Sequence, residues 1–532
     1  MRDARWLIAI WLCFLVRGVF YCLALPLWEG FDEYSHFSHV QHVDRGQWLI
    51  RLDTRATREV ERSIELAPMA WTLRNDAPPH DTYESYRKLP AEERRSRERA
   101  LAALTPSPGD AVTPLASESQ QPPLSYWLMA APYKMAGSSL PVQVLALRLL
   151  NLLLTSAVVP AAWLAARRVF PGSGYGLPLA IAAAAALFPE LMFDGARISN
   201  SALSIALYSA LAVLCLAVVD GSRRAAPWMG VTVGLGLLTK GFFLTAVPLM
   251  IVLLVWAMWK CGLPRRFAAS SMALAAALPG WWYLHNLRTT GGFSTAIQDA
   301  ALKHMPMSER LRHVVDVNWF TAIDSTFFSH IWFGGWSFLQ VRAWIYHVFA
   351  ALAVLAIVGL VLALRRGNPE RRYIVVLAAL YVLFCSGIAY HVLLTYLANG
   401  ISSSAGWYLC AVLVPETVLL AAGLRVFTRW AVAGLAAAFA LLDLYGMLFV
   451  ALPYYSGVIA HRPNGMLEAF HFSRLSEIGM DETLRRLAVN HPYGPVTIAV
   501  AGCLYVVATI ALAVASVILQ TAPLQVKRIS AD

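Results

Sequence analysis

Residues 6–36 read WLIAIWLCFLVRGVFYCLALPLWEGFDEYSH, an apolar run that ends at a proline and then turns acidic. A helix needs about 20 mostly apolar residues to cross a bilayer, and residues 6–26 supply them. The run is too long for a signal peptide and has no clear cleavage site, so we expect a retained first span. This stretch predicts a membrane protein with one arginine, Arg17, inside its first helix and a carboxylate pair, Asp32 and Glu33, just beyond it.

The composition of the whole chain agrees with this interpretation. Of its 532 residues, 58% are hydrophobic and only 14% are charged, whereas a soluble domain is about half apolar and about a quarter charged. These values exclude a disordered chain, a nucleic-acid-binding domain and a disulfide scaffold. The net charge of +11 fits the Lys and Arg that membrane proteins place in cytoplasmic loops. The seven cysteines form no Cys-x-x-Cys pair, and we interpret them as small apolar residues of helices.

Apolar runs recur along the chain and predict an all-α, polytopic membrane protein with about 12 transmembrane helices. The fifth and sixth runs are short and are also compatible with one broken helix. The predicted spans are 6–26, 143–166, 176–193, 201–219, 228–240, 242–259, 267–284, 344–364, 373–397, 407–424, 431–452 and 496–520.

Basic residues recur at every second loop and predict the orientation. Loops on one side carry almost none, which places both termini in the cytoplasm and favours an even number of spans. The basic positions are Arg2, Arg5, Arg167–Arg168, Arg223–Arg224, Lys260, Arg265, Arg266, Arg365–Arg366, Arg371–Arg372, Arg425, Arg429 and Lys527–Arg528.

This orientation divides the chain into a membrane core and outer segments. Residues 1–452 form the predicted transmembrane core, with 27–142 and 285–343 as two large outer loops. Residues 453–495 form a third outer loop, and 496–532 form the last helix with a cytoplasmic tail. We expect residues 84–103 to be a solvated surface helix, because Glu and Arg alternate there at helical spacing.

Asp32 and His36 are four residues apart and share one face if this segment is helical. A carboxylate beside an imidazole at the membrane boundary is suited to general-base chemistry, because partial desolvation raises an aspartate pKa. The alternative is a helix cap, since Asp is a favoured N-cap residue. His36, His39 and His42 recur every three residues, but the stripe lacks a fourth ligand, and we predict no metal there.

Other polar residues stand where apolar spans meet the outer face. Pro122 and Pro123 start a predicted juxtamembrane helix that contains Tyr126. Lys240 lies between two short apolar runs and faces a cavity more plausibly than lipid. The remaining candidates for substrate contacts are Arg17 inside the first span, Arg197 after the third, and His285 and Arg288 after the seventh. Lys240, His285 and Arg288 together are candidates to clamp a phosphate, with membrane anchoring as the other interpretation of Arg288.

These parts, in this order, resemble the membrane-embedded glycosyltransferases of the GT-C superfamily, such as the protein O-mannosyltransferases and the aminoarabinose transferases of lipid A. The resemblance covers roughly residues 1–424. Its motifs are Arg17 and the Asp32–Glu33 pair with His36, Pro122 to Trp127, Arg197–Asn200, Leu238–Lys240, Trp282–Asn286 and Gly406-Trp407-Tyr408.

The resemblance implies a sugar transferase of a bacterial cytoplasmic membrane with its active site on the periplasmic face. Its donor would be a polyprenyl-phosphate sugar, and its acceptor would be a hydroxyl of a lipid, glycan or protein. Membrane lipids would contact its spans, and the enzyme would need no further cofactor. Asp32 would be the general base of an inverting transfer, and Glu33 would orient it or the acceptor.

The chain departs from the family pattern at four positions. Gln121 stands where Lys usually precedes Pro-Pro, and His285 stands where Arg is usual. Asn200 replaces an acidic residue before the fourth span, and Trp407 replaces an Arg. Two other classes therefore stay open: a transporter or lipid flippase, although no internal repeat is visible, and a non-catalytic lipid-binding partner.

Overall fold

The computed structural model describes residues 2–521, apart from 107–108, 296–297, 299–300, 366–370 and 463. It is built from helices, and in the described residues extended chain pairs only through isolated bridges. The predicted all-α, multi-pass architecture is confirmed. The predicted basic residues Arg366, Lys527 and Arg528 and the tail after residue 521 lie outside the described part.

Within the described residues, fourteen helices make up the bundle. They are α1 (Arg2–Ala24), α7 (Leu140–Thr155), α8 (Val158–Val169), α9 (Gly176–Leu187), α10 (Pro189–Gly195), α11 (Ser201–Val219), α12 (Ala225–Leu237), α13 (Val247–Cys261), α14 (Arg265–Thr290), α18 (Ala343–Arg365), α19 (Arg371–Asn399), α20 (Leu413–Leu424), α21 (Ala431–Gly446) and α25 (Pro495–Thr521).

Shorter helices form the outer segments and the breaks in the bundle. The outer helices are α2 (Glu33–Asp44), α3 (Arg58–Leu66), α4 (Tyr83–Lys88), α5 (Ala91–Ala102), α6 (Leu124–Met135), α16 (Met307–Arg312), α17 (Trp319–Ile331), α22 (Leu452–Ser456), α23 (Phe472–Ile478) and α24 (Met480–Leu487). Single turns of 3₁₀- or π-helix are η1 (Trp71–Leu73), η2 (Gly241–Ala246), η3 (His313–Val315), η4 (Gly406–Val412) and η5 (Met447–Ala451).

Each of the twelve predicted spans overlaps a helix, but the count of twelve is not confirmed. In the described residues, nine helical segments are long and apolar enough to cross a membrane, and the bent pair α9–α10 makes ten. The other two predicted spans fall on α12, which is short, and on α14, whose two ends are polar. The predicted surface helix 84–103 is two helices, α4 and α5, because Pro90 interrupts the backbone hydrogen bonding between them.

Small residues set how closely two pairs of helices approach. A side chain at Gly359 of α18 would lie 2.0 Å from the Gly423 carbonyl oxygen of α20, and one at Gly230 of α12 would lie 2.1 Å from the Ser271 carbonyl oxygen of α14. Helices in membranes gain their packing energy from such close backbone contact, since lipid tails are as apolar as the side chains. These pairs therefore hold the bundle at its two sides.

A buried polar network around one ion pair holds the first span to the last two. Arg17 of α1 lies 2.9 Å from the Asp443 carboxylate of α21, and neither side chain is exposed. The hydroxyls of Tyr21 and Tyr505 donate to the same carboxylate at 2.6 and 2.8 Å. The structure thus places Arg17, a predicted substrate contact, in a network that joins α1, α21 and α25, and it records no contact between Arg17 and Asp32.

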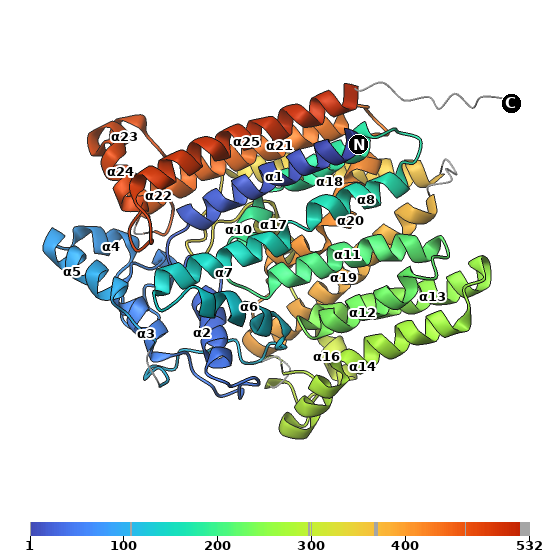
Figure 1. Ribbon diagram of the computed structural model, residues 1–532, viewed down its shortest axis with the longest axis horizontal. Helices are drawn as coiled ribbons and strands as arrows, with labels where there is room; N and C mark the ends of the chain where they lie inside the picture. The colour runs from blue at the N-terminus through green and yellow to red at the C-terminus, as the bar shows by residue number, and fades with distance from the viewer. Residues whose placement is uncertain are drawn as a thin grey trace.

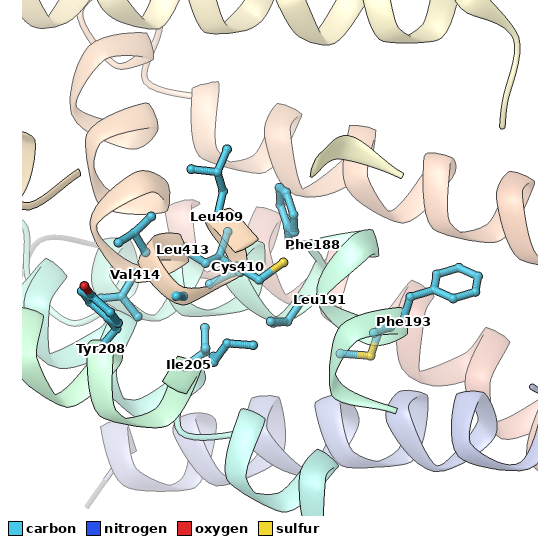
Figure 2. Packing of buried hydrophobic residues seen from close by; sticks show 14 of the residues in the cluster. Phe188, Leu191, Phe193, Ile205, Tyr208, Leu409, Cys410, Leu413 and Val414 are labelled. Atoms are coloured by element: carbon cyan, nitrogen blue, oxygen red, sulfur yellow. The ribbon is translucent and has the colours of Figure 1, made fainter. Parts of the chain in front are cut away.

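The first and the third of the predicted outer segments gather at one end of the bundle. Figure 1 shows α2 to α5 and α22 to α24 at this end and the start of α1 at the other. Below them, the side chains of α10 and α11 pack against η4 and α20; Figure 2 shows Phe188, Leu191, Ile205, Leu409 and Cys410 in this core. This packing holds in place the chain segments that surround the candidate site.

Candidate functional site

Asp32 lies where the chain leaves α1 and enters α2. It occupies the N-cap position of α2 with a left-handed backbone, φ 56° and ψ 16°, and its side chain makes no capping hydrogen bond. An aspartate tolerates this conformation better than most residues do, but at a cost that surrounding structure must offset. The interpretation of Asp32 as a helix cap therefore holds for its position at the N-cap of α2, but its side chain caps no backbone N–H.

The Asp32 carboxylate is half-buried, and within the described residues no hydrogen bond reaches it. Burial raises the pKa of Asp32 above its usual value, while the cations Arg197 and Lys240 oppose that rise. A carboxylate that is partly desolvated and has no partner is suited to accept a proton from a ligand.

Recorded hydrogen bonds join three of the sequence motifs to one another in the neighbourhood of Asp32. The backbone N–H of Leu124 donates to the Leu238 carbonyl oxygen at 3.1 Å, which joins the start of α6 to the segment that carries Lys240. The Asn200 amide donates to the Thr239 carbonyl oxygen at 3.3 Å. The Lys240 ammonium donates to the Ser201 hydroxyl at 3.0 Å.

Aromatic rings close the site on the side of η4. Phe31 stacks on Trp407 with ring centroids 3.8 Å apart, and the Arg197 guanidinium lies 5.6 Å from the Trp407 ring centroid. The Lys240 ammonium lies 5.0 Å from the ring centroid of Tyr408. A narrow space of about 10 Å³ beside Lys240 is lined by Trp407 and Tyr408, among others.

Arg197 and Lys240 differ in how many of their hydrogen-bond donors the protein already uses. Arg197 is buried, forms an ion pair with Asp194 through Nε at 2.9 Å and donates to the Phe31 carbonyl oxygen at 3.1 Å. Lys240 is half-buried and has one hydrogen bond, to the neutral Ser201 hydroxyl. Arg197 is thus held by the protein, whereas Lys240 keeps donors for a ligand.

Glu33, predicted beside Asp32, is committed to an ion pair. Its carboxylate receives two hydrogen bonds from the Arg148 guanidinium, at 2.6 and 2.7 Å, and one from the Ile198 backbone N–H at 3.1 Å. Arg148 also donates to the carbonyl oxygens of Leu25 and Pro26, at 2.7 and 2.8 Å. The pair fixes the end of α1 relative to α2 and thereby holds the backbone on both sides of Asp32.

The three histidines of α2 do not meet at one point. His36 Nδ1 hydrogen-bonds the Tyr126 hydroxyl at 2.8 Å. His39 donates from Nδ1 to the Glu118 carbonyl oxygen at 2.9 Å, and His42 donates from Nε2 to the Arg55 carbonyl oxygen at 2.9 Å. Burial and the nearby cations hold the pKa of His36 well below its usual range, so its ring is neutral. In the described residues, no group of three His, Cys, Asp or Glu side chains has the geometry of a metal site.

His285 and Arg288 are exposed at the end of α14. The His285 ring contacts Trp282, with centroids 6.2 Å apart, and the structure records no contact from either residue to Lys240 or Asp32. The predicted three-residue clamp is therefore not assembled in this conformation.

Two departures from the family pattern contact one another. The Asn200 amide donates to the Gln121 side-chain oxygen at 2.9 Å, so these two side chains form a neutral amide pair. Gln121 also donates to Glu118 at 3.1 Å.

Three further charged residues near Asp32 are not among the candidates predicted from the sequence. Glu118 lies beside Asp32, and burial together with the Asp32 charge raises its pKa to about 7; nothing in its polar segment singles it out. Arg148 lies inside the second predicted span, so a search for charges at membrane depth would have found it. Glu29 is buried and receives the hydroxyl of Tyr83 at 2.8 Å.

A larger apolar cavity lies on the far side of η4. It measures about 450 Å³ and is lined by side chains of α17 to α21, with Leu409 of η4 at one wall. Its polar groups are His330 and Glu416, whose imidazole Nε2 and carboxylate oxygens lie 2.9 Å apart. Glu416 is thus paired with His330, and Asp443 is paired with Arg17.

Comparison with known proteins gives one family match. A family model described as "Predicted membrane protein (DUF2142)" matches residues 14–416. No curated protein matches the chain.

The chain is also similar to solved structures of low identity. One is ArnT from Cupriavidus metallidurans bound to undecaprenyl phosphate, at 16% identity and a TM-score of 0.40, over 90% of this chain and 77% of that one. Another is the archaeal oligosaccharyltransferase AglB from Archaeoglobus fulgidus in complex with an inhibitory peptide and a dolichol-phosphate. It has 12% identity and a TM-score of 0.36, over 97% of this chain and 56% of that one.

Proposed function

The chain belongs to the DUF2142 family of predicted membrane proteins, and from that premise we propose that it is an integral membrane glycosyltransferase. It transfers a sugar from a polyprenyl-phosphate donor to an acceptor hydroxyl at the outer, periplasmic face of a bacterial cytoplasmic membrane. The proposal rests on the motif resemblance and on one observation above the others: the unpartnered, half-buried carboxylate of Asp32, with Lys240 and Arg197 as its nearest cations.

The proposed reaction is a single displacement. Asp32 takes the proton of the acceptor hydroxyl, and the oxygen attacks the anomeric carbon. The bond from that carbon to the phosphate oxygen breaks, its electron pair leaves with the polyprenyl phosphate, and the configuration inverts. Lys240 stabilises the negative charge on the leaving phosphate, an effect that is strong where water is excluded.

Glu33 acts in this proposal as a positioning residue. Its paired carboxylate cannot serve as the base without losing the Arg148 bonds at 2.6 and 2.7 Å. It holds the left-handed backbone at Asp32 instead. The apolar cavity behind η4 supports the donor assignment, since its lining suits a hydrocarbon tail and its wall, Leu409, adjoins the residues that contact Lys240 and Arg197.

The test compares wild type with Asp32→Asn in nanodiscs supplied with polyprenyl-phosphate sugars, with sugar transfer and donor hydrolysis measured together. Asp44→Asn is the control, because Asp44 is exposed at the other end of α2. We expect Asp32→Asn to lower the rate by about 10²–10⁴-fold, the usual contribution of a general base, and Asp44→Asn to retain it.

Equal rates for wild type and Asp32→Asn would contradict the assignment of the base. The alternatives give different results in the same preparation. A transporter or flippase would move the donor across proteoliposomes without chemical change, and a non-catalytic partner would bind it and leave it intact.

A further inference from the structure

A second polar cavity lies outside the Asp32 site, where the first outer segment meets the last. It measures about 50 Å³, enough for several water-sized groups. Side chains of α4 and α5 form one wall, α24 with the residues after it forms the opposite wall, and Pro26 and Leu27 lie between them. Figure 1 shows α4 and α5 near the end of the bundle that carries α22 and α24.

The charge of this cavity is predominantly positive. Three arginines line it, Arg87, Arg94 and Arg486, against one carboxylate, Glu98. Two of the arginines are held by the protein: Arg87 donates to the Tyr454 carbonyl oxygen at 3.0 Å, and Arg486 pairs with Glu482 at 2.9 Å.

Arg94 differs from the other two. Its Nε–H is buried, and within the described part of the chain no hydrogen-bond acceptor meets it. On the opposite wall, the side-chain oxygen of Asn490 is also buried without a donor. Buried polar groups are normally hydrogen-bonded, so each of these two unpaired atoms needs an explanation.

The unpaired Arg94 Nε–H and the unpaired Asn490 side-chain oxygen are complementary to one kind of ligand. A guanidinium fork fits the oxygens of a phosphate or a carboxylate, and an amide oxygen accepts a hydrogen bond from a hydroxyl. A ligand that carries an anionic group and a hydroxyl would satisfy both at once. Phosphorylated or acidic sugar units and the glycerol-phosphate headgroup of a lipid share this chemistry.

We propose that this cavity is a binding site for a hydroxyl-bearing anion, with Arg94 as its main anion contact and Asn490 as its hydroxyl contact. The site is separate from the transfer reaction, because none of the residues assigned to that reaction lines it. It adjoins the reaction site through Glu29, which receives the hydroxyls of Tyr83 and Tyr455, two residues of the cavity wall. Its test does not depend on transferase activity.

The test measures thermal unfolding of the full chain in phosphatidylcholine nanodiscs as glycerol 3-phosphate is added, with glycerol and chloride at equal ionic strength as references. A ligand that binds the folded state raises the melting temperature in proportion to its affinity. We expect a rise with glycerol 3-phosphate alone and a loss of about tenfold in affinity in Arg94→Gln, the effect of one charge-assisted hydrogen bond. Arg94→Gln should fold, because the buried Nε–H of Arg94 has no hydrogen-bond acceptor to lose.

The matched control is Arg95→Gln, the same change of charge on the next residue of α5. Arg95 is 65% exposed, pairs with Glu92 and does not line the cavity. Asn490→Asp is a second variant, which should weaken binding because it adds a negative charge. Equal losses in Arg94→Gln and Arg95→Gln, or no rise in wild type, would overturn the proposal.

The same measurement in phosphatidylglycerol nanodiscs distinguishes the two sources of the anion. If the lipid headgroup fills the cavity, wild type gains stability over Arg94→Gln without any addition and no longer responds to glycerol 3-phosphate. If the ligand is a soluble or polymer-bound sugar, the response to glycerol 3-phosphate is the same in both lipids.

Discussion

Glu29 offers a test of how burial shapes the region around the site. Its side chain is 1% exposed and receives hydrogen bonds from the Tyr83 hydroxyl at 2.8 Å, the Ser337 backbone N–H at 2.9 Å and the Tyr455 hydroxyl at 3.3 Å. Burial raises the pKa of Glu29 from 4.5 to about 7, although these donors oppose the rise. The folded protein therefore binds a proton that the unfolded chain has released.

The sign of the stability change follows from this proton. Between pH 4.5 and about 7 the folded state holds more protons than the unfolded state, so stability falls as pH rises through this window and levels off above it. A difference of about 2.5 pKa units at about 1.36 kcal/mol each corresponds to about 3 kcal/mol. Glu29→Gln replaces the titrating carboxyl group with an amide of nearly the same shape. The variant therefore does not lose this stability as the pH rises.

The assay is chemical unfolding in mixed micelles, followed by tryptophan fluorescence at pH 5 and pH 8. We expect Glu29→Gln to match wild type at pH 5 and to exceed it by up to about 3 kcal/mol at pH 8. Glu477→Gln, on the exposed face of α23, should show no such difference. Comparing the variant with wild type also cancels the similar slope that Glu118 contributes. An equal difference at both pH values, or a less stable variant at pH 8, would refute the reasoning.

Two further predictions concern pairs of side chains. Arg17→Met and Asp443→Leu should each lower the free energy of unfolding by about 3–5 kcal/mol, since each leaves a buried charge without its partner, and the double variant should lose less than the sum; additive losses would show that the pair is not coupled. Asn200→Asp should lower the melting temperature because it buries a lone carboxylate, and Gln121→Lys in the same chain should restore it, as the side chains lie 2.9 Å apart. A double variant no more stable than Asn200→Asp would contradict this pairing.

The sequence predicted the architecture well where hydrophobic length alone decides it. Long apolar runs must be helices in a bilayer, because no water is present to pair with backbone groups. Prediction was weaker where a helix is short or polar at its ends, as in α12 and α14, since length and hydropathy then disagree. It also missed the interruption at Pro90, where charge spacing alone indicated one continuous helix.

Charged residues within the spans show a second limit of prediction from the sequence. The sequence marks Arg17, Glu416 and Asp443 as costly and therefore paired, but it does not name the partners. Arg17 and Asp443 are separated by 426 residues, and His330 and Glu416 by 86. Such pairs follow from how the helices pack.

The sequence by itself determined that this is a multi-pass helical membrane protein and that polar motifs stand at the ends of its spans, because both follow from local hydropathy. Only the tertiary structure decided what each polar residue does. It left Asp32 without a partner, bound Glu33 to Arg148, kept Arg17 in the bundle and brought Gln121 against Asn200. The reason is physical: the cost of a buried charge depends on which groups from distant parts of the chain reach it, and packing alone sets those distances.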